Sequence, residues 1–452
     1  MEYKSINTDA LQQLTPEMAW SYMLVPYHKG TLLSCYGEQG RSYDSIQQEL
    51  EVFLGVPIDI SYIPAEDLKK LLYTYYKKER SAADKNIAAN IYPDHKGEGF
   101  FTKLITEAFE SYASDIHLEA YEQQCRIRFR IDGKLIEKYI LEKGLYASLV
   151  NQIKIMANMD ISEKRLPQDG RIMYNRNKEK FDVRVSSLPA IYGEKIVLRL
   201  LTRHVELLDI LHLGFTQKQL ADYLAAVGKP HGLVLISGPT GSGKSTTLYA
   251  TLIKLNNLTN NILTIEDPVE YTLAGVNQVQ LKEEIGLNFS SALRTFLRQD
   301  PDIIMLGEIR DADTAQMAIR SSLTGHLILS TIHTNSAWGS ISRLVDMGVH
   351  PYLISNTLVL CVAQRLIRTT CPHCQKEGCP HCYYTGYKGR KAIYEVIPVD
   401  KQMQEAIRTS RNEIGDLLKE RQITSLKDSA MELFSKGETT MEEILPILQQ
   451  EE

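Results

Sequence analysis

Several features that would place the chain in a specialised class are missing or scarce in this sequence. Among 452 residues, no apolar run reaches the roughly 18 residues that a membrane-spanning helix needs. The opening residues carry no charged-then-apolar signal pattern, so we expect a cytosolic protein. Lysine and arginine total 51 against 56 aspartates and glutamates, a net charge of −5. This balance argues against a dedicated nucleic-acid coat, although a local basic patch would escape the count.

Cysteine is also scarce, and its distribution is uneven. Four of the seven cysteines crowd into one short segment, in two C-x-x-C turns. Those four are Cys371, Cys374, Cys379 and Cys382. Each turn can present two thiolates to one tetrahedral Zn²⁺, so a structural zinc site is favoured over a disulfide framework. A redox dithiol is the alternative, and it is less favoured because two copies stand side by side; His373 and His381 are not expected to be ligands.

The residues that are present make an ordinary globular composition, with 43% hydrophobic and 24% charged residues. A chain of this length exceeds what one hydrophobic core supports, so we expect two to four domains. Changes in composition predict a small N-terminal α/β module, a polar linker, a second module built on a helix and strand pairs, a hinge and a large final domain. Their predicted bounds are residues 1–78, 79–99, 100–201, 202–217 and 218–452.

The final domain contains short apolar runs separated by helical patterns. Four of these runs are GLVLIS, NILTIED, PDIIMLGE and GHLILSTIH. Continuous apolar strands of this kind are typical of a parallel sheet that is buried on both faces. Because the strands alternate with helices, the pattern predicts an α/β nucleotide-binding domain.

The strongest motif is a phosphate-binding loop. The segment GPTGSGKS matches G-x-x-x-x-G-K-[ST]. It follows the predicted strand VLIS and precedes TTLYATLIKL, a run of residues that is expected to form a helix. Its glycines let backbone N–H groups face phosphate oxygens, and the helix N-terminus adds partial positive charge. We expect Lys244 to face the β- and γ-phosphates of ATP and the Ser245 hydroxyl to ligate Mg²⁺. The predicted nucleotide-binding residues are Gly238, Pro239, Thr240, Gly241, Ser242, Gly243, Lys244, Ser245 and Thr246.

Acidic residues follow two of the apolar runs. Glu308 stands just beyond PDIIMLG, and in nucleotide hydrolases with this loop an acidic residue on a neighbouring strand binds Mg²⁺ directly or through water. The segment TIEDPVE adds Glu266, Asp267 and Glu270. Alone, these three carboxylates would be read as a solvated loop. Near a phosphate loop, a role in the site is the better interpretation.

Two histidines flank another apolar run. His326 and His333 stand in TGHLILSTIHTN, on either side of a predicted strand. We therefore expect them at the two ends of one element and not in a shared metal site. His333, which Thr334 and Asn335 follow, is better placed to contact a terminal phosphate.

Taken together, the long motifs resemble the secretion ATPases of type II secretion and type IV pilus systems. The final domain contributes GPTGSGKSTTLYA, TIEDPVEY, LRQDPDIIMLGEIRD and TGHLILSTIHTN, and later AQRLIRTTCPHC and GYKGRKAIYEV. The second module contributes SDIHLEA, RIRFRIDGKL, EKRLPQDGRI, DVRVSSLP and YGEKIVLRLL in the expected order. The resemblance covers about residues 100–400 densely, whereas residues 1–78 are only loosely similar to the family's N-terminal domain.

The resemblance implies an α/β fold with a RecA-like parallel-sheet ATPase domain, preceded by a PAS-like α+β domain and the small N-terminal module. It also implies a homohexamer that binds ATP between its second and RecA-like domains. By motif, the implied site residues are Lys244 and Ser245 of the phosphate loop, Glu270 of the aspartate box, Glu308 of Walker B, His326 and His333 of the histidine box, and the phosphate-contacting Arg171 and Arg184. Whether Glu270 or Glu308 activates the water stays open at this point, with Glu270 preferred.

The implied function is ATP hydrolysis that powers pilus or pseudopilus assembly from the cytoplasmic face of the inner membrane. Platform and docking proteins would recruit the hexamer there, and residues 1–78 would dock such a partner. A retraction ATPase is the alternative within the family, but retraction ATPases characteristically lack the cysteine cluster and the first module. A nucleic-acid translocase and a nucleotide-gated scaffold are the alternatives from other classes; no nucleic acid is expected, and intact Lys244, Glu270 and Glu308 argue against a scaffold.

Two departures from the family's pattern limit these expectations. Only Gln375–Gly378 separate the two C-x-x-C turns, where assembly ATPases usually carry a long insertion. Zinc binding is still expected, without the surface that the insertion would form. The first module lacks the R-L-G-type motifs of relatives that bind cyclic-di-GMP, so that ligand is not assigned.

Overall fold

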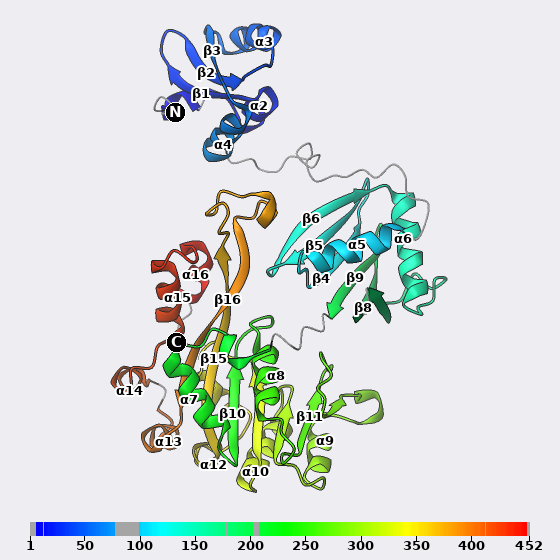
Figure 1. The fold of residues 1–452 in the computed structure, drawn as a ribbon, viewed down its shortest axis with the longest axis vertical. Helices are drawn as coiled ribbons and strands as arrows, with labels where there is room; N and C mark the ends of the chain where they lie inside the picture. Colours follow the sequence, from blue (N-terminus) through cyan, green and yellow to red (C-terminus); the bar gives the residue numbers. More distant parts are fainter. Residues whose placement is uncertain are drawn as a thin grey trace. The chain divides into compact units, whose positions relative to one another are not determined.

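The computed structural model describes residues 6–11, 13–76, 99–176, 179–201, 208–411 and 413–449 (Figure 1). The chain forms two compact units: residues 1–93 with Lys138–Ile140, and residues 94–137 with 141–452. Apart from Gly99, the predicted linker lies outside the described residues, as do residues 202–207 of the predicted hinge. No helix in the described part of the chain is long and apolar enough to cross a membrane.

The N-terminal module is a three-stranded sheet with helices packed on it. Strand β1 pairs antiparallel with β2, and β2 pairs parallel with β3. A helix, α3, connects the two parallel strands, because a parallel pair needs a crossover connection. The strands are β1 (Leu24–Lys29), β2 (Leu33–Glu38) and β3 (Ile58–Ile63), and the helices are α1 (Thr8–Leu11), α2 (Pro16–Tyr22), α3 (Asp44–Leu54) and α4 (Ala65–Tyr75).

The second module contains a six-stranded sheet in the order β6-β5-β4-β9-β8-β7. In β5 the apolar residues are buried and the three arginines between them are half-buried, as the period-2 pattern predicts. Asp132 and Gly133 form the turn into β6, so the predicted hairpin is confirmed. The elements are α5 (Gly99–Glu110), β4 (Asp115–Ala120), β5 (Cys125–Ile131), β6 (Lys134–Leu141), α6 (Lys143–Met156), β7 (Gln168–Arg176), β8 (Glu179–Ala190) and β9 (Gly193–Leu201).

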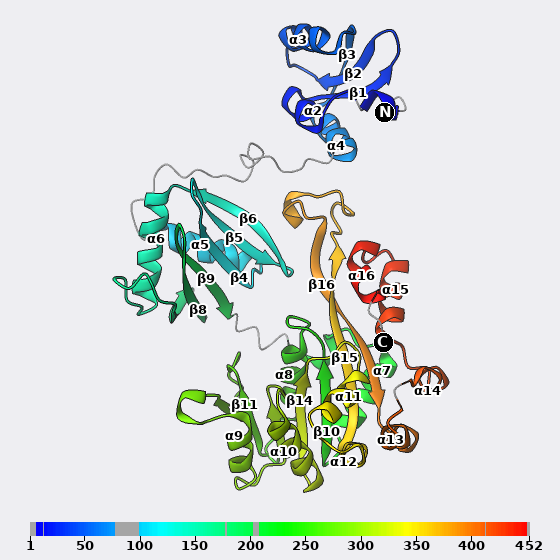
Figure 2. The same ribbon diagram turned by 180° about the vertical axis from the view of Figure 1, so that it is seen from behind.

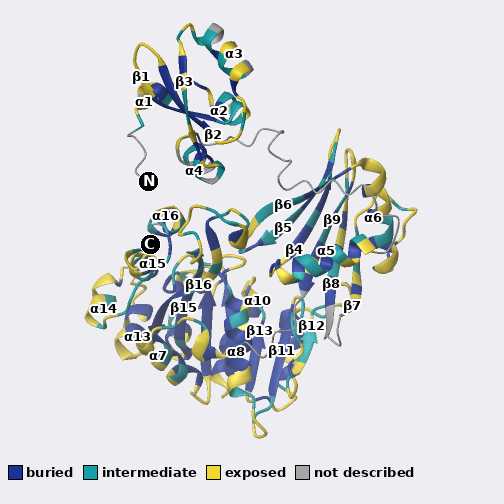
Figure 3. Cartoon of the chain, turned by 45° about the horizontal axis from the view of Figure 1, so that its top comes forward, coloured by how far each residue is buried: buried dark blue, intermediate teal, exposed yellow. Residues whose placement is uncertain are grey.

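The final domain is built on a seven-stranded sheet in the order β12-β11-β13-β14-β10-β15-β16. Its neighbouring strands are parallel, except that β15 and β16 pair antiparallel. The strands are β10 (Gly232–Ser237), β11 (Ile262–Glu266), β12 (Asn277–Gln280), β13 (Ile303–Leu306), β14 (Leu327–Ile332), β15 (Leu358–Thr370) and β16 (Tyr387–Pro398). Strands β10, β11, β13 and β14 are buried at every position, which confirms the predicted doubly covered sheet (Figure 3).

Helices cover both faces of this sheet. Helices α7 and α8 pack on the face that is in front in Figure 1, and α10, α11 and α12 lie in front of the sheet in Figure 2. The helices are α7 (Gln217–Val227), α8 (Lys244–Leu255), α9 (Phe289–Phe296), α10 (Ala312–Leu323), α11 (Gly339–Asp346), α12 (Pro351–Thr357), α13 (Lys401–Arg408), α14 (Gly415–Glu420), α15 (Leu426–Ser435) and α16 (Met441–Leu448). In such sheets, ligands bind outside the carboxyl ends of the parallel strands.

Candidate nucleotide site and cysteine cluster

The phosphate loop connects the carboxyl end of β10 to the first residue of α8. Gly238 and Gly243 adopt φ of 148° and 89°, a region that favours glycine. Both also pack tightly against β15: a Cβ on Gly238 would lie 2.5 Å from the Gln364 carbonyl oxygen, and one on Gly243 would lie 2.7 Å from Gln364 Nε2. The glycines of the motif therefore satisfy both the backbone turn and the contact with the neighbouring strand.

Lys244 is the first residue of α8 and points back into the loop. Its Nζ donates to the carbonyl oxygens of Gly238 at 2.8 Å and Pro239 at 3.0 Å, and the residue is only 8% exposed. Burial lowers the pKa of Lys244, and nearby Arg365 lowers it further, while the Glu308 carboxylate acts in the opposite direction. An anion at the loop would therefore gain a desolvated cation as its partner.

Glu308 follows the carboxyl end of β13 after one glycine. Its carboxylate contacts the Arg310 guanidinium and lies 3.3 Å from His333 Nε2. Burial acts to raise the pKa of Glu308, but the Arg310 and His333 contacts more than offset it, so the pKa is lowered. The carboxylate therefore remains ionised and available to a cation or a water.

His333 reaches this carboxylate because it follows the carboxyl end of β14, the strand between β13 and β10. His326 precedes the same strand and lies at the opposite edge of the sheet, where its Nδ1 is 2.9 Å from the Ser321 carbonyl oxygen. The prediction that the two histidines stand at the two ends of one element is confirmed. His333 alone is close to the phosphate-loop edge.

The acidic segment that begins with the last residue of β11 contains carboxylates with different surroundings. Glu266 is 3% exposed and accepts hydrogen bonds from the Tyr249 hydroxyl, from Thr264 Oγ1 at 2.5 Å and from Gln278 Nε2 at 3.1 Å. These bonds make Glu266 part of the interior. Asp267 instead contacts Arg310, with 3.4 Å between its Oδ2 and Nη2 of the arginine.

Glu270 lies a few residues further on and is more open. Its side chain is 33% exposed, and its Oε2 lies 3.7 Å from Arg184 Nη1. Burial raises the pKa of Glu270, and the nearby Arg184 and Arg199 only partly counteract this effect. A carboxylate with a raised pKa is a stronger proton acceptor than an ordinary glutamate.

Three arginines stand side by side on adjacent strands of the second module. Arg171 on β7 is directly opposite Arg184 on β8, and Arg184 is directly opposite Arg199 on β9. Arg184 also donates to the Val269 carbonyl oxygen at 2.8 Å, so it contacts the Glu270 segment. The Arg171 guanidinium instead pairs with Asp182 of its own sheet.

Arg199 and Arg310 are the site residues that sequence reasoning missed. Arg199 Nε lies 3.0 Å from Asp115 Oδ1, and Arg310 bridges Glu308 and Asp267. Both stand within segments that were recognised as motifs, KIVLRLL and LGEIRD. In the first segment, residues alternate between the two faces of a strand, so Arg199 shares a face with Val197. This alternation is the sequence signal that could have identified Arg199.

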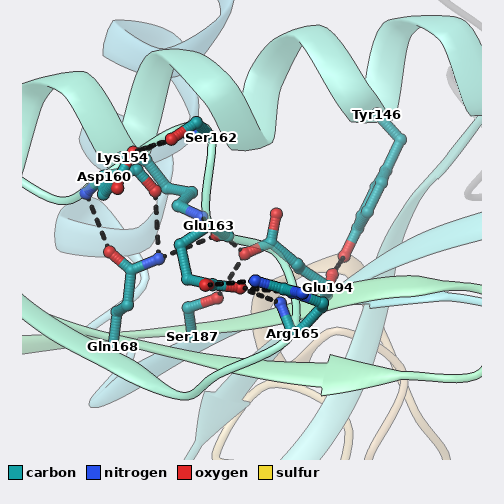
Figure 4. Close-up of polar contacts among 9 residues, drawn as sticks. All are labelled: Tyr146, Lys154, Asp160, Ser162, Glu163, Arg165, Gln168, Ser187 and Glu194. Carbon is teal, nitrogen blue, oxygen red and sulfur yellow. Dashed lines mark hydrogen bonds and ion pairs between the residues drawn. The ribbon is translucent and has the colours of Figure 1, made fainter.

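A buried ion pair supports the segment that leads into Arg171 (Figure 4). Lys154, which is fully buried, donates from Nζ to Glu194 Oε1 at 2.7 Å and to the Glu163 carbonyl oxygen at 2.7 Å. Gln168 Nε2 donates to the same Glu163 carbonyl oxygen at 2.9 Å. The pair therefore ties α6 and β9 to the loop that precedes β7.

The four clustered cysteines converge in space. Their Sγ atoms all lie within 4.8 Å of one another, and three of the pairs are 3.7–3.8 Å apart. Tetrahedral Zn–S bonds of about 2.3 Å place ligand sulfurs about 3.8 Å apart, so the four thiols fit zinc. Each is a free cysteine. The residues concerned are Cys371, Cys374, Cys379 and Cys382.

The cysteine loop is fastened to the end of the chain. Arg368, just before it, forms a two-pronged ion pair with Glu443 of α16, and its guanidinium lies 4.0 Å from the centre of the Tyr387 ring. His373 and His381 stack on each other with ring centroids 4.3 Å apart. Neither histidine belongs to the group of possible ligands found among the described residues.

The fold and the site define a class: a RecA-like ATPase, in which a phosphate loop and an acidic residue on the next-but-one strand meet at the carboxyl edge of a parallel sheet. The family model described as "Type II/IV secretion system protein" matches residues 94–446. The chain belongs to this family and is an ATP hydrolase.

Individual relatives agree with this assignment. The chain is similar to the type II secretion system protein E of Klebsiella pneumoniae, with 45% identity over 77% of this chain and 75% of that protein. It is equally similar to the type IV pilus assembly ATPase PilB of Myxococcus xanthus, with 45% identity over 76% of this chain and 66% of that protein. Among solved structures, the pilus retraction motor PilT with bound ADP matches at a TM-score of 0.58 and 27% identity, over 78% of this chain and 98% of that one.

Proposed function

We propose that the chain is a cytoplasmic, homohexameric ATPase that powers assembly of a pilus or pseudopilus. Platform and docking proteins would recruit it to the cytoplasmic face of the inner membrane, and residues 1–78 would dock one of them. The main support for the proposal is that Lys244, Glu308 and His333 lie close together at one edge of the sheet. The cysteine cluster and the first module, which retraction ATPases characteristically lack, favour assembly.

In this proposal the phosphate loop, residues 238–246, holds the phosphates of ATP. Lys244 would exchange its bonds to loop carbonyls for bonds to the β- and γ-phosphates. The Ser245 hydroxyl and Glu308 are the residues that would hold Mg²⁺. When bound, Mg²⁺ neutralises negative charge on the phosphates.

Glu270 is the preferred general base. Its raised pKa makes it the better proton acceptor for an attacking water, whereas the lowered pKa of Glu308 makes that carboxylate a weaker base and a better cation ligand. His333, beside Glu308, would contact the terminal phosphate. The division of roles between the two glutamates follows from burial, which prevails at Glu270, and from the Arg310 and His333 contacts, which outweigh burial at Glu308.

Arg171 and Arg184 would neutralise charge on the transferred phosphoryl group, because guanidinium groups match phosphate oxygens in geometry and charge. Arg184 already contacts the Glu270 segment. Arg171 would have to exchange Asp182 for a phosphate oxygen. The second module, residues 100–201, would therefore contribute part of the ATP site.

The four cysteines would hold one structural Zn²⁺. A closed set of four thiolates leaves no open position for a water, so the metal would stabilise its loop and take no part in hydrolysis. A redox role would require the cysteines to form disulfides. No nucleic acid is expected as a partner.

The proposed roles are tested by comparing Glu270→Gln and Glu308→Gln with the wild-type enzyme. Both variants should bind ATP and lose turnover by about 100-fold or more. Near-normal turnover in either variant would contradict the role given to that residue. Stimulation of the wild-type rate by a membrane platform protein would support the assembly motor, whereas stimulation by nucleic acid would support a translocase.

A further inference from the structure

Two residues of β15 lie directly behind the phosphate loop. Strand β15 runs parallel to β10, with Ala363 opposite Ser237, so Gln364 and Arg365 stand beside the start of the loop. A Cβ on Gly238 would lie 3.2 Å from Arg365 Nη1, and Thr247 of α8 donates to Gln364 Oε1 at 2.8 Å. The phosphate loop and the helix behind it therefore rest on this pair of residues.

The same arginine also holds a second loop. Arg365 Nη2 donates at 2.7 Å to the carbonyl oxygen of Asn335, two residues after His333. This loop, residues 333–338, is fastened at further points: Ser237 Oγ donates to the Ser336 carbonyl oxygen at 3.1 Å, and Ala337 N donates to Glu395 Oε1 at 2.8 Å. One guanidinium thus lies between the phosphate loop and the loop that carries His333.

The buried charge of the Arg365 guanidinium is unusual for a residue whose only role is packing. Arg365 is 5% exposed, and its buried neighbour of opposite charge is Glu395 on β16, which is 7% exposed. Burial lowers the pKa of Arg365, and Glu395 acts in the opposite direction. Buried charges often contribute less to stability than apolar residues of the same size. A guanidinium, however, can hold two groups at once through its planar fork, which an apolar side chain cannot do. Arg365 Nη1 donates at 3.0 Å to the carbonyl oxygen of Gln364, the residue that packs against Gly238, while Nη2 holds Asn335.

We propose that Arg365 is a positioning residue for ATP hydrolysis. It links the phosphate loop to the loop of His333, so the position of His333 relative to Glu308 depends on the conformation of the phosphate loop. Arg365 is proposed to act through these two loops. The inference rests on the proposed function of Lys244, Glu308 and His333. A shift of the backbone at Gly238 would be transmitted through Gln364 and Arg365 to Asn335, because Gly238 packs against the Gln364 carbonyl oxygen, to which Arg365 Nη1 donates, and Nη2 donates to the Asn335 carbonyl oxygen.

The test uses the full-length protein and the variants Arg365→Met and Arg365→Lys. Lysine keeps the charge but lacks the planar fork, so both variants should lower kcat about 10- to 100-fold, while the affinity for ATP changes less than about threefold. Arg421→Lys is the control, since Arg421, which follows α14, donates through two nitrogens to Asp400, which precedes α13, and neither residue belongs to the two loops. The Arg421→Lys control should leave kcat unchanged. Thermal unfolding of the three variants measures their stability separately from their activity.

A double variant separates this proposal from the one on which it rests. If Arg365 acts through His333, Arg365→Met combined with His333→Ala should be no slower than His333→Ala alone. If His333→Ala is slow and the double variant is slower still, by the product of the two single decreases in kcat, the coupling would be overturned. A wild-type kcat in Arg365→Lys would also overturn the proposal. This variant provides the test if Arg365→Met does not fold. If His333→Ala hydrolyses ATP at the wild-type rate, the role proposed for His333 fails, and the coupling fails with it.

Discussion

Glu270 and Arg184 face each other across the boundary between two sheets, with 3.7 Å between the carboxylate oxygen Oε2 and the guanidinium nitrogen Nη1. Burial raises the pKa of Glu270, and this arginine is the first of the charges that lower it again. Through this arginine, the second module therefore reduces the basicity of the glutamate that we propose as general base.

The first prediction is a shift in the pH dependence of kcat. Glu270 must be deprotonated to act as a base, so kcat should fall as the pH drops through its raised pKa. Arg184→Met removes a charge that lowers this pKa, so the acid limb of the profile should move to higher pH. The measurement is kcat against pH at saturating ATP, with Arg411→Met, at a surface ion pair with Asp416, as the control. An unmoved acid limb in Arg184→Met would argue against Glu270 as the base.

Much of this site was predictable from the sequence, because its main residues are marked by local spacing. The phosphate loop between a strand and a helix, the acid after PDIIMLG and the paired C-x-x-C turns each needed only a short segment. The apolar runs likewise predicted the parallel sheet, since strands buried on both faces need apolar residues at every position.

The parts that the sequence left open depend on neighbours far along the chain. Glu266 and Glu270 stand in one acidic segment, yet only Glu266 is enclosed by Tyr249, Thr264 and Gln278. The pairing of Arg171 with Asp182 follows from the register of β7 with β8, which no local pattern gives. The position of Arg365 behind the phosphate loop likewise requires β15 to lie beside β10.

A second prediction concerns metal content. The purified protein should contain one Zn²⁺ per chain, and the double change of Cys371 and Cys374 to Ser should release it, because two thiolates cannot close a tetrahedral site. Metal loss should loosen the loop between β15 and β16 before it affects nucleotide binding. Elemental analysis of protein prepared without chelator provides the measurement. Well under one equivalent of zinc together with quantitative disulfide would favour the redox alternative.

A third prediction concerns the buried pair of the second module. Lys154→Met leaves the Glu194 carboxylate buried without its cation, which should cost about 3–5 kcal/mol in the free energy of unfolding. The double variant Lys154→Met, Glu194→Met should recover part of this loss, because no buried charge remains. Denaturant unfolding of the wild type, the single variant and the double variant measures the difference. A single variant as stable as the wild type would show that the pair is dispensable.

A fourth prediction tests whether the second module is part of the ATP site. A fragment that begins at Lys218 retains the phosphate loop, Glu270 and Glu308 but loses Arg171, Arg184 and Arg199. It should bind ATP poorly and hydrolyse it hardly at all, since the arginines that we propose to neutralise the phosphates are absent. Full activity of a folded fragment would mean that the arginine row takes no part in hydrolysis.

The most direct test of the account is ATP turnover by the purified full-length protein and by Lys244→Ala, measured as phosphate release in the presence of Mg²⁺. Lys244 is the desolvated cation of the phosphate loop, so its removal should weaken ATP binding and abolish release, while the wild-type protein turns over ATP steadily. Equal phosphate release by Lys244→Ala and the wild-type protein would contradict the assignment of this site as the ATPase centre.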